Sequence, residues 1–329
     1  MSALLDEVAS RLEGVAAPAV SLADRSTYRV GGAAALAAIM DSEADLDTVG
    51  GALAGVDVPL LVVGRGSNLL VSDAGFAGLV LILGPHFETV TIADTLVTAG
   101  GAAPLPVVAR QTVAAGLTGF EWAVGVPGSM GGAVRMNAGG HGSDLAHCLV
   151  DARIVDFRAG RDHRVPVAEL ALSYRHSSIA SHELVVDAVL ALAPGDADEG
   201  RRAISEIVTW RRQHQPGGAN AGSVFTNPPG DSAGRLIDEA GCRGLRVGTA
   251  EVSTKHANFI QVDEGGSADD IVALMIEVRR RVIEWAGVAL VPETRMVGFD
   301  PGTLATLGLD SDPAPARSPG TQSPEQASP

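Results

Sequence analysis

The chain has 329 residues, of which 46% are hydrophobic, and its formal net charge is -15. This length exceeds what one ordinary core covers, so we expect two or three lobes. The acidic charge argues against general binding to nucleic acid or to anionic lipid, although a small anionic ligand remains possible. Such a ligand would depend on arginine, because Lys255 is the only lysine among 24 cationic residues.

The cysteine content and the N-terminal segment indicate where the protein resides. Cys148 and Cys242 are the only cysteines, which is too few for a disulfide framework or a four-cysteine zinc site. Residues 1–20 carry four charged side chains between short apolar pieces, so they lack the hydrophobic region of a signal peptide. We therefore expect a cytoplasmic protein without a metal centre.

The first two thirds of the chain predict an α+β region. Apolar residues at helical spacing predict a helix within residues 1–19, and a second helix is expected over residues 104–117. Acidic, glycine-containing residues 193–200 are the best candidate for a linker to a further lobe. Short strands with glycine punctuation are expected at 59–64, 80–83, 89–101, 149–157 and 183–192.

The last third predicts two helices and a tail. Residues 201–216 have apolar positions at helical spacing and end at a proline, and residues 267–287 carry one apolar stripe behind a capping pair, Ser267 with Asp270. From Asp300 onward, six prolines among small polar residues predict a disordered tail, with room for one short ordered piece at 304–309.

Two glycine-rich segments are candidates for binding phosphate. Residues 62–70 (VVGRGSNLL) place a turn directly after a strand, and seven of the eighteen residues in 125–142 are glycine. Exposed backbone N–H groups in such turns bind phosphate oxygens, and two of them suit a diphosphate, although a turn that only closes a strand uses the same residues. Neither segment has the Rossmann GxGxxG spacing, which disfavours a nicotinamide-binding domain of that type.

A third segment, residues 221–260, mixes hydroxyl, amide and ammonium groups without a long apolar run. Ser223 follows Gly222 and precedes Val224 and Phe225, so a small residue lets the backbone approach a ligand next to a hydroxyl. This arrangement predicts a catalytic or ligand-facing corner.

Six motifs in one consistent order resemble the UDP-N-acetylenolpyruvoylglucosamine reductases, flavoenzymes that complete UDP-N-acetylmuramate in bacterial cell-wall synthesis. The resemblance covers about 270 residues. The motifs are STYRVGG (26–32), GRGSNLLVSDAGFAGLVL, GVPGSMGGAVRMNAGGHG, LSYRHSS, AGSVFTNP and VPETRMVG (291–298).

The resemblance implies an α+β fold with a FAD-binding domain of the vanillyl-alcohol-oxidase (PCMH) type. An N-terminal helix (1–19) would precede this two-subdomain unit (20–198), and an α+β substrate-binding lobe (199–300) would be followed by the tail (301–329). FAD would be held without a covalent bond. The residues implied to contact it are Gly64, Arg65, Gly66, Ser67, Asn68, Gly125, Pro127, Gly128, Ser129, Gly132, Asn137, Gly139 and Gly140.

By position in these motifs, the resemblance places the family's catalytic groups on Arg175, Ser223 and Glu293. Reduction of an enolpyruvyl group leaves negative charge near its carboxylate, which the planar fork of Arg175 can bind. Ser223 would protonate the carbanion-like carbon. Glu293 would either hydrogen-bond to the developing charge, if burial raises its pKa, or orient Arg175, if it stays ionised.

Further residues of these motifs are expected around the UDP-sugar, namely Tyr174 and Asn227. Lys255 either pairs with phosphate or lies on the rim of a strand. Two departures from the family matter: Thr226 stands where many members have a cation, and none of the 47 residues between Arg175 and Ser223 is a tyrosine. The tyrosine-bearing lid loop of one reductase subclass is therefore expected to be absent.

The leading hypothesis is an NADPH-dependent FAD reductase that converts UDP-N-acetylglucosamine enolpyruvate to UDP-N-acetylmuramate by ping-pong hydride transfer. The missing Rossmann fingerprint agrees with this scheme, because the nicotinamide need only visit the flavin. Two alternatives remain open. One is a flavin-dependent alcohol or sugar oxidase in which His141 or His86 tethers the flavin, and the other is a catalytically silent flavin-binding protein.

Overall fold

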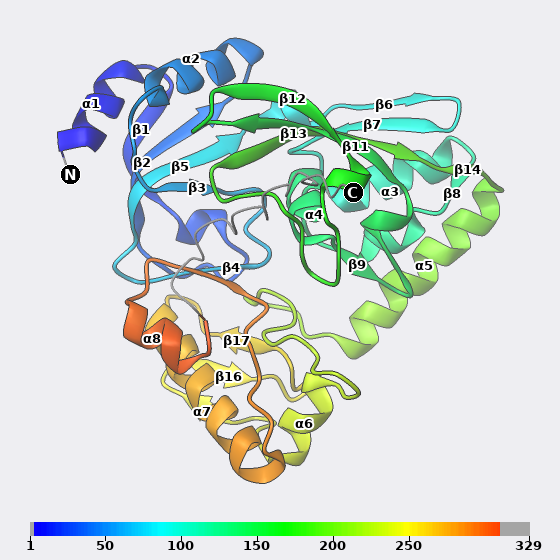
Figure 1. The fold of residues 1–329 in the computed structure, drawn as a ribbon. Helices are drawn as coiled ribbons and strands as arrows, with labels where there is room; N and C mark the ends of the chain where they lie inside the picture. Colours follow the sequence, from blue (N-terminus) through cyan, green and yellow to red (C-terminus); the bar gives the residue numbers. More distant parts are fainter. Residues whose placement is uncertain (1–2, 310–329) are drawn as a thin grey trace, which may run out of the picture.

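The computed structural model describes residues 3–309, which form two larger sheets and, below them in Figure 1, a smaller C-terminal lobe. The first sheet has the order β1-β2-β5-β3 and is parallel except for the β1–β2 pair. Strand β5 is apolar and buried along most of its length, as is typical of a central parallel strand. The elements of this subdomain are α1 (Ala3–Arg11), β1 (Ala16–Ser21), β2 (Ala33–Met40), α2 (Glu43–Leu53), β3 (Leu60–Val62) and β5 (Phe76–Leu83).

The N-terminal helix is shorter than expected over residues 1–19. It ends at Arg11, and Gly14, with φ +87°, turns the chain into β1, which pairs with β2 as a strand of the first sheet. Glycine adopts this left-handed conformation without strain. The segment therefore belongs to the first subdomain, where Leu5, Val8 and Leu12 pack into the core.

The second sheet is entirely antiparallel and has the order β12-β11-β13-β7-β6. Its core is formed with the helical elements that pack against it. The elements are β6 (Val90–Ala93), β7 (Leu96–Gly100), α3 (Leu105–Ala114), η3 (Glu121–Gly125), α4 (Met130–Met136), β11 (Leu149–Asp156), β12 (Arg161–Pro166) and β13 (Glu183–Ala191).

Several short elements connect these units. Two pairs of very short strands are antiparallel, β9 with β10 and β8 with β14. The short elements are η1 (Ala23–Arg25), η2 (Pro85–Glu88), β8 (Leu117–Thr118), β9 (Gly139–Gly140), β10 (Ser143–Asp144), η4 (Leu145–His147), η5 (Val167–Glu169) and β14 (Ala193–Pro194).

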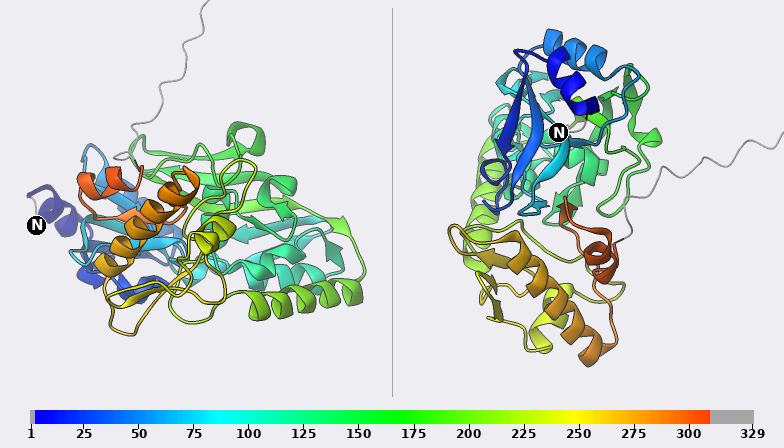
Figure 2. Two further views of the ribbon diagram at one scale, coloured as in Figure 1. Left: turned by 90° about the horizontal axis from the view of Figure 1, so that it is seen from below. Right: turned by 90° about the vertical axis from the view of Figure 1, so that its left-hand side faces the viewer.

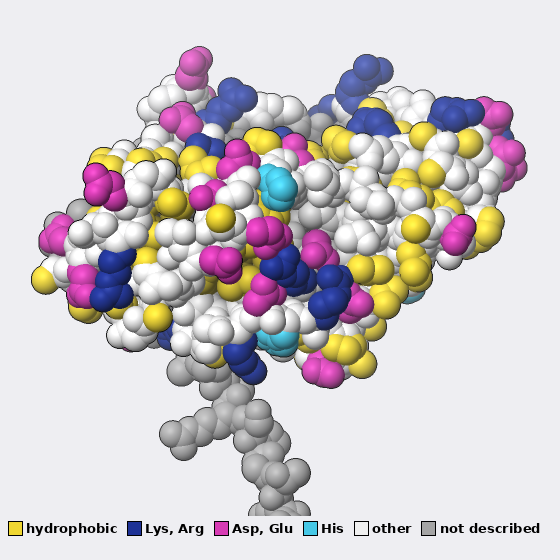
Figure 3. All heavy atoms as spheres, turned by 90° about the horizontal axis from the view of Figure 1, so that it is seen from above, with side chains coloured by type: hydrophobic (Ala, Val, Ile, Leu, Met, Phe, Trp, Pro, Cys, Tyr) yellow, Lys and Arg dark blue, Asp and Glu magenta, His cyan; other side chains and the backbone are white. Residues whose placement is uncertain are grey.

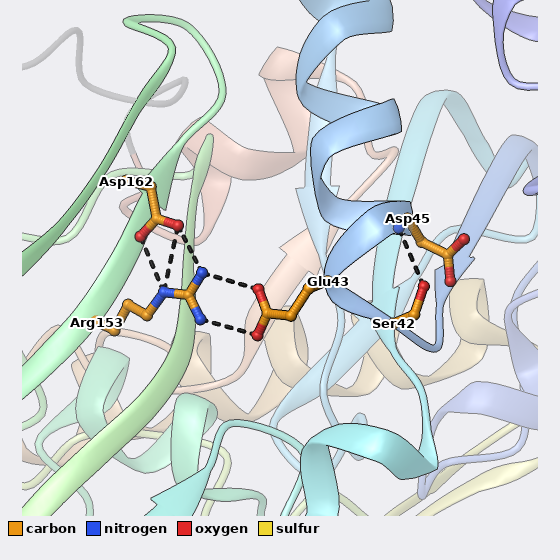
Figure 4. A network of polar contacts seen from close by, with 5 residues as sticks. All are labelled: Ser42, Glu43, Asp45, Arg153 and Asp162. Atoms are coloured by element: carbon orange, nitrogen blue, oxygen red, sulfur yellow. Dashed lines mark hydrogen bonds and ion pairs between the residues drawn. The ribbon is translucent and has the colours of Figure 1, made fainter.

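A network of ion pairs joins the two subdomains (Figure 4). Arg153 on β11 donates to both carboxylate oxygens of Glu43 at 2.9 Å, in the first turn of α2, and also to Asp162 on β12. Hydrogen bonding to Arg153 lowers the pKa of both carboxyl groups. Because these pKa values are depressed, the stabilisation is present at neutral pH and is lost as the pH falls through them.

The boundary expected at residue 198/199 is wrong, because it falls inside helix α5 (Ala197–His214). Asp196 caps this helix, and Ile204 and Ile207 pack against the core of the second subdomain. The change in composition at 193–200 therefore marks the start of a helix that still packs against the second subdomain. The chain enters the C-terminal lobe only after His214.

The C-terminal lobe has a small antiparallel sheet of order β15-β16-β17, with helices packed around it. Leu307, near the end of the described residues, is fully buried in the core of this lobe. Residues 301–309 are therefore ordered, although a disordered tail was expected from residue 301. Residues 310–329 of that tail lie outside the described part of the chain. The elements are α6 (Ala233–Glu239), β15 (Arg246–Val247), β16 (Ala250–Val252), β17 (Ile260–Val262), α7 (Ala268–Ala286) and α8 (Pro301–Thr306).

The C-terminal lobe is tied back to the first subdomain. Strand β18 (Arg295–Val297) pairs in parallel with β4 (Leu69–Val71). The carboxylate of Asp73 accepts hydrogen bonds from Ser267 Oγ at 2.7 Å and from two backbone N–H groups in the first turn of α7. Tyr28 and Leu70 pack within the core of the C-terminal lobe. The right-hand view in Figure 2 shows this lobe against one end of the two subdomains.

The described residues carry charges of both signs on their surface. On the face in Figure 3, acidic and basic side chains lie interspersed. Among residues 3–309, no helix combines the length and the apolar character needed to cross a membrane. Within the same residues, no cluster of metal-ligating side chains occurs.

Candidate active site

The first glycine-rich turn, residues 64–68, can only be built with glycine at its centre. Gly66 has φ +60°, and a Cβ there would overlap the carbonyl oxygen of Arg25 and lie 2.7 Å from Ser26 Cα. The backbone N–H of Thr27 donates to the Gly66 carbonyl at 3.1 Å. The STYRVGG segment therefore holds the turn in place, and the backbone conformation of the turn is fixed.

The two glycine-rich segments lie against each other. A Cβ on Gly64 would overlap Ser129 Oγ, and a Cβ on Gly128 would lie 3.5 Å from Ser67 Oγ. Ser129 is buried and immediately precedes α4. Residues about 60 positions apart in the sequence thus form one surface. Two turns that bind the same diphosphate must adjoin in this way.

Asn137 supports the loop that carries the candidate arginine. It is buried, has a left-handed backbone conformation (φ +39°), and its amide group donates to the Ser173 carbonyl at 3.0 Å and to Asp144 at 3.3 Å. Its side-chain oxygen accepts from the Ala146 N–H. Both amide protons are therefore used within the protein, so Asn137 positions residues 173–175, and a contact with FAD stays a prediction.

A pocket of about 250 Å³ opens beside this loop. A Cβ on Gly140 or Gly142 would meet no atom within 4 Å, so backbone faces open space there. The lining residues are Asn137, Gly139, Gly140, Gly142, Ser143, Asp144, His147, Tyr174 and Arg175.

Arg175 and Glu293 form an ion pair in the site. Arg175 Nε donates to Glu293 Oε1 at 2.7 Å, and its Nη2 donates to the Gly139 carbonyl at 3.2 Å. The Glu293 side chain is only 13% exposed. Burial raises the pKa of Glu293, and the opposing attraction of Arg175 offsets this only in part. Both roles left open for Glu293 thus have a physical basis.

Ser223 is brought to this pair through the backbone. The N–H of Glu293 donates to the carbonyl of Val224 at 2.7 Å, and the N–H of Thr226 donates to the carbonyl of Val291 at 2.9 Å. On the other side, Asn68 of the first glycine-rich turn donates its amide to the Glu293 carbonyl at 3.1 Å. The serine segment, the glutamate segment and the first glycine-rich turn therefore adjoin one another.

Comparison with known proteins follows the same division of the chain. A family model described as FAD binding domain matches residues 34–165, and a model described as UDP-N-acetylenolpyruvoylglucosamine reductase, C-terminal domain, matches residues 213–297. The UDP-N-acetylenolpyruvoylglucosamine reductase of Heliobacterium modesticaldum is 42% identical over 288 residues, 87% of this chain and 91% of that protein. The chain belongs to the UDP-N-acetylenolpyruvoylglucosamine reductase family.

Two further members of this reductase family match most of the chain. The reductase of Parvibaculum lavamentivorans is 40% identical, with 91% of this chain and 96% of that protein covered. The crystal structure of the Thermus caldophilus reductase superimposes with a TM-score of 0.73 at 35% identity, covering 84% of this chain and 97% of that one. The expected family and the α+β fold with a FAD-binding domain are confirmed.

The residues expected at the UDP-sugar occupy different places in the reductase fold. Tyr174 is 58% exposed, lines the arginine pocket, and its ring centre lies 5.1 Å from Arg175 Cζ. Asn227 accepts the N–H of Ala233 at 3.0 Å, at the start of α6. Lys255 lines a second pocket instead, so the structure does not bring it to the arginine pocket.

The second pocket, of about 390 Å³, is cationic and was missed by sequence reasoning. Arg211 and Arg212 reach it from the last turn of α5. Arg211 is half-buried, and this burial lowers the pKa of its guanidinium. The lining residues are Arg211, Arg212, Gln215, Pro216, Gly217 and Lys255, none of them acidic.

The departure at Thr226 has a structural role in this member of the reductase family. Its hydroxyl donates to the Val291 carbonyl at 3.1 Å, next to the backbone bond between the same two residues. Thr226 thus reinforces the pairing of the serine and glutamate segments.

The histidines considered as flavin tethers lie outside the arginine pocket. The His141 ring packs edge-to-face on Trp210 with ring centres 5.3 Å apart and lies beside Gly125. His86 is an exposed residue of η2 whose backbone N–H donates to Asp41. Neither imidazole is among the residues that line the pocket with Arg175.

Proposed function

We propose that this chain is an NADPH-dependent FAD enzyme that reduces UDP-N-acetylglucosamine enolpyruvate to UDP-N-acetylmuramate in peptidoglycan precursor synthesis. The observation that carries the proposal is the Arg175–Glu293 ion pair, 2.7 Å long, whose arginine lines a pocket together with Gly139, Gly140 and Gly142 of the second glycine-rich segment. The pair joins side chains 118 residues apart in a family whose relatives bear the name of this activity.

The site fits a flavin diphosphate. The two glycine-rich segments adjoin at Gly64 and Ser129, and Gly66 has a conformation and surroundings that exclude any side chain. Turns of this kind present backbone N–H groups to phosphate oxygens, so residues 64–68 and 125–132 would hold the diphosphate. Bound FAD would supply the chemistry of hydride transfer from NADPH to the terminal carbon of the enolpyruvyl group.

Arg175 would bind the carboxylate of the enolpyruvyl group and stabilise the negative charge that develops beside it. Its guanidinium already donates to Glu293 and to the Gly139 carbonyl, so two contacts fix the plane of the fork before substrate binds. A preorganised, permanently charged donor of this kind lowers the barrier because it need not reorient during the reaction.

Ser223 would protonate the carbon next to the carboxylate once the hydride has added. Its segment is paired with the Glu293 segment through the Glu293 N–H to Val224 carbonyl bond. A hydroxyl is a weak acid, but a carbanion-like carbon is a strong base, so proton transfer is favourable when the two are held in contact.

The second pocket would bind the diphosphate of the UDP-sugar and, in turn, the phosphates of NADPH. Arg211, Arg212 and Lys255 gather three cations in a protein of net charge -15, and Arg211 is partly desolvated. A buried cation is stabilised by an anion that replaces its lost water. Tyr174 and Asn227 would contact the sugar and diphosphate nearer to the reacting carbon.

The pH dependence of kcat/KM should report the ionisation of the Glu293 carboxyl group. Because burial raises its pKa, the protonated form is present below that raised pKa and is lost as the pH rises through it. If protonated Glu293 hydrogen-bonds to the developing charge, kcat/KM falls on the alkaline side by about tenfold per pH unit. Glu293→Gln stays neutral, so this limb should vanish from its profile; an identical limb in both proteins would rule out this role.

Anaerobic spectroscopy on the purified protein tests the function as a whole. We expect a yellow protein whose flavin absorbance is bleached by NADPH and restored by the enolpyruvyl sugar, with no dependence on oxygen. An oxidase would be bleached by an alcohol and restored by air. A silent flavin-binding protein would respond to neither, and a protein that stays colourless after incubation with FAD would overturn the proposal.

A further inference from the structure

Asn258, between β16 and β17, makes an unusual set of contacts with the serine segment. Its side chain is nearly buried, with the residue 4% exposed. The side-chain oxygen accepts from the Phe225 N–H at 3.0 Å, and the side-chain amide donates to the Phe225 carbonyl at 2.8 Å. Its own carbonyl accepts from the Val224 N–H at 2.9 Å. One residue thus holds three backbone groups in the two residues that follow Ser223.

The opposite side of the same segment is bound to the glutamate segment. The carbonyl of Val224 accepts the N–H of Glu293 at 2.7 Å, and Phe225 forms a β-bridge with Pro292. The chain at 224–225 is therefore held between Asn258 on one side and the Glu293 segment on the other. Gly222, with φ +77°, precedes the serine and gives little restraint from the N-terminal side.

Asn258 is itself fixed by its neighbours. Its N–H donates to Nδ1 of His256 at 3.2 Å, and the His256 ring packs on Phe259 with ring centres 4.8 Å apart. Burial lowers the pKa of His256, which favours the neutral ring that can accept this bond. The buried Ser253 accepts from the Lys255 N–H and donates its own N–H to the Phe259 carbonyl.

We propose that Asn258 is a positioning residue. It fixes the position of Ser223 relative to Glu293 and Arg175 for the protonation step. An asparagine amide carries one acceptor and two donors, so it can pair with both backbone groups of Phe225 as a second strand would. Aspartate lacks the donor, and alanine lacks both groups. The inference rests on the proposed function, because it assigns Asn258 to the step in which Ser223 acts.

The test compares Asn258→Asp and Asn258→Ala with wild type in the two half-reactions, with each rate expressed per bound flavin. Flavin reduction by NADPH should keep the wild-type rate. Flavin reoxidation by the enolpyruvyl sugar should slow by about 10-fold in Asn258→Asp and about 100-fold in Asn258→Ala, since displacements near 1 Å cost this much. The loss should fall on kcat, with KM for the sugar nearly unchanged.

A matched control and a second readout separate positioning from general damage. Asn220→Asp adds the same charge close to the serine segment, at a half-buried asparagine whose side chain bonds to the local turn at 217–222. It should keep both half-reactions within about twofold of wild type. Hydrogen–deuterium exchange should show faster exchange at the Val224 and Phe225 amides in the Asn258 variants only.

The outcomes are distinguishable. Equal slowing of both half-reactions, a change confined to KM, or failure of both Asn258 variants to fold would overturn the positioning role, since each would mean that the residue serves binding or the core. Wild-type protein that does not react with the enolpyruvyl sugar would instead overturn the proposed function. The exchange rates at Val224 and Phe225 would then still report whether Asn258 holds this segment.

Discussion

Ser223→Ala is expected to accept electrons from NADPH at the wild-type rate and to reduce the enolpyruvyl sugar about 10²–10⁴ times more slowly, the range that a positioned proton donor usually contributes. The substitution removes only the hydroxyl. The bonds that hold the segment are made by the backbone of Val224, Phe225 and Thr226, so the pairing with the Glu293 segment should survive.

A stopped-flow experiment can measure the two half-reactions of Ser223→Ala separately under anaerobic conditions. Ser223→Cys is the matched control, because a thiol with an ordinary pKa of about 8.5 can still donate a proton. We expect it to recover part of the lost rate. Near-normal product formation by Ser223→Ala would remove this serine from the mechanism.

Arg175→Lys is expected to lower kcat by about 10²–10³-fold, which is the usual cost of one preorganised donor at developing charge. The guanidinium spans Glu293 and the Gly139 carbonyl from two different nitrogens. A lysine ammonium is a point charge on a flexible stem and cannot keep both contacts and also present a planar fork to a carboxylate.

Steady-state kinetics with varied enolpyruvyl sugar will show where the loss in Arg175→Lys falls. Arg110→Lys is a suitable control, since Arg110 is exposed on α3 and donates to the carbonyl one turn earlier; its kinetics should match wild type. A rise in KM at constant kcat would mean that Arg175 contributes only to binding.

Local patterns predicted individual elements well. The apolar stripe and capping serine predicted a helix over 267–287, and α7 runs Ala268–Ala286 with Ser267 as its cap. These signals are local, because spacing and a single cap decide them. The lobe boundary was missed because it depends on what Ile204 and Ile207 pack against, and no composition change records that.

The site was predictable only in part, and mainly through the family resemblance. Motifs located Arg175 and Glu293, yet their contact across 118 residues follows from the tertiary fold. The cationic pocket was missed because Arg211 and Arg212 look like the polar end of a helix until Lys255 is placed beside them. Asn258 could not be identified from the sequence, because its role depends on hydrogen bonds to a segment 33 residues away.

The pairing of β18 with β4 has a consequence for how the protein is made. Asn68, in the turn predicted to contact flavin, bonds to a residue 225 positions later. At roughly 5–20 residues per second on the ribosome, translation delivers that partner about ten to forty-five seconds after the turn. Until then, the nascent N-terminal portion has an unpaired strand edge. We therefore expect the flavin cofactor to bind only after Val297 has been synthesised. We also expect any truncation upstream of Val297 to leave the chain without flavin.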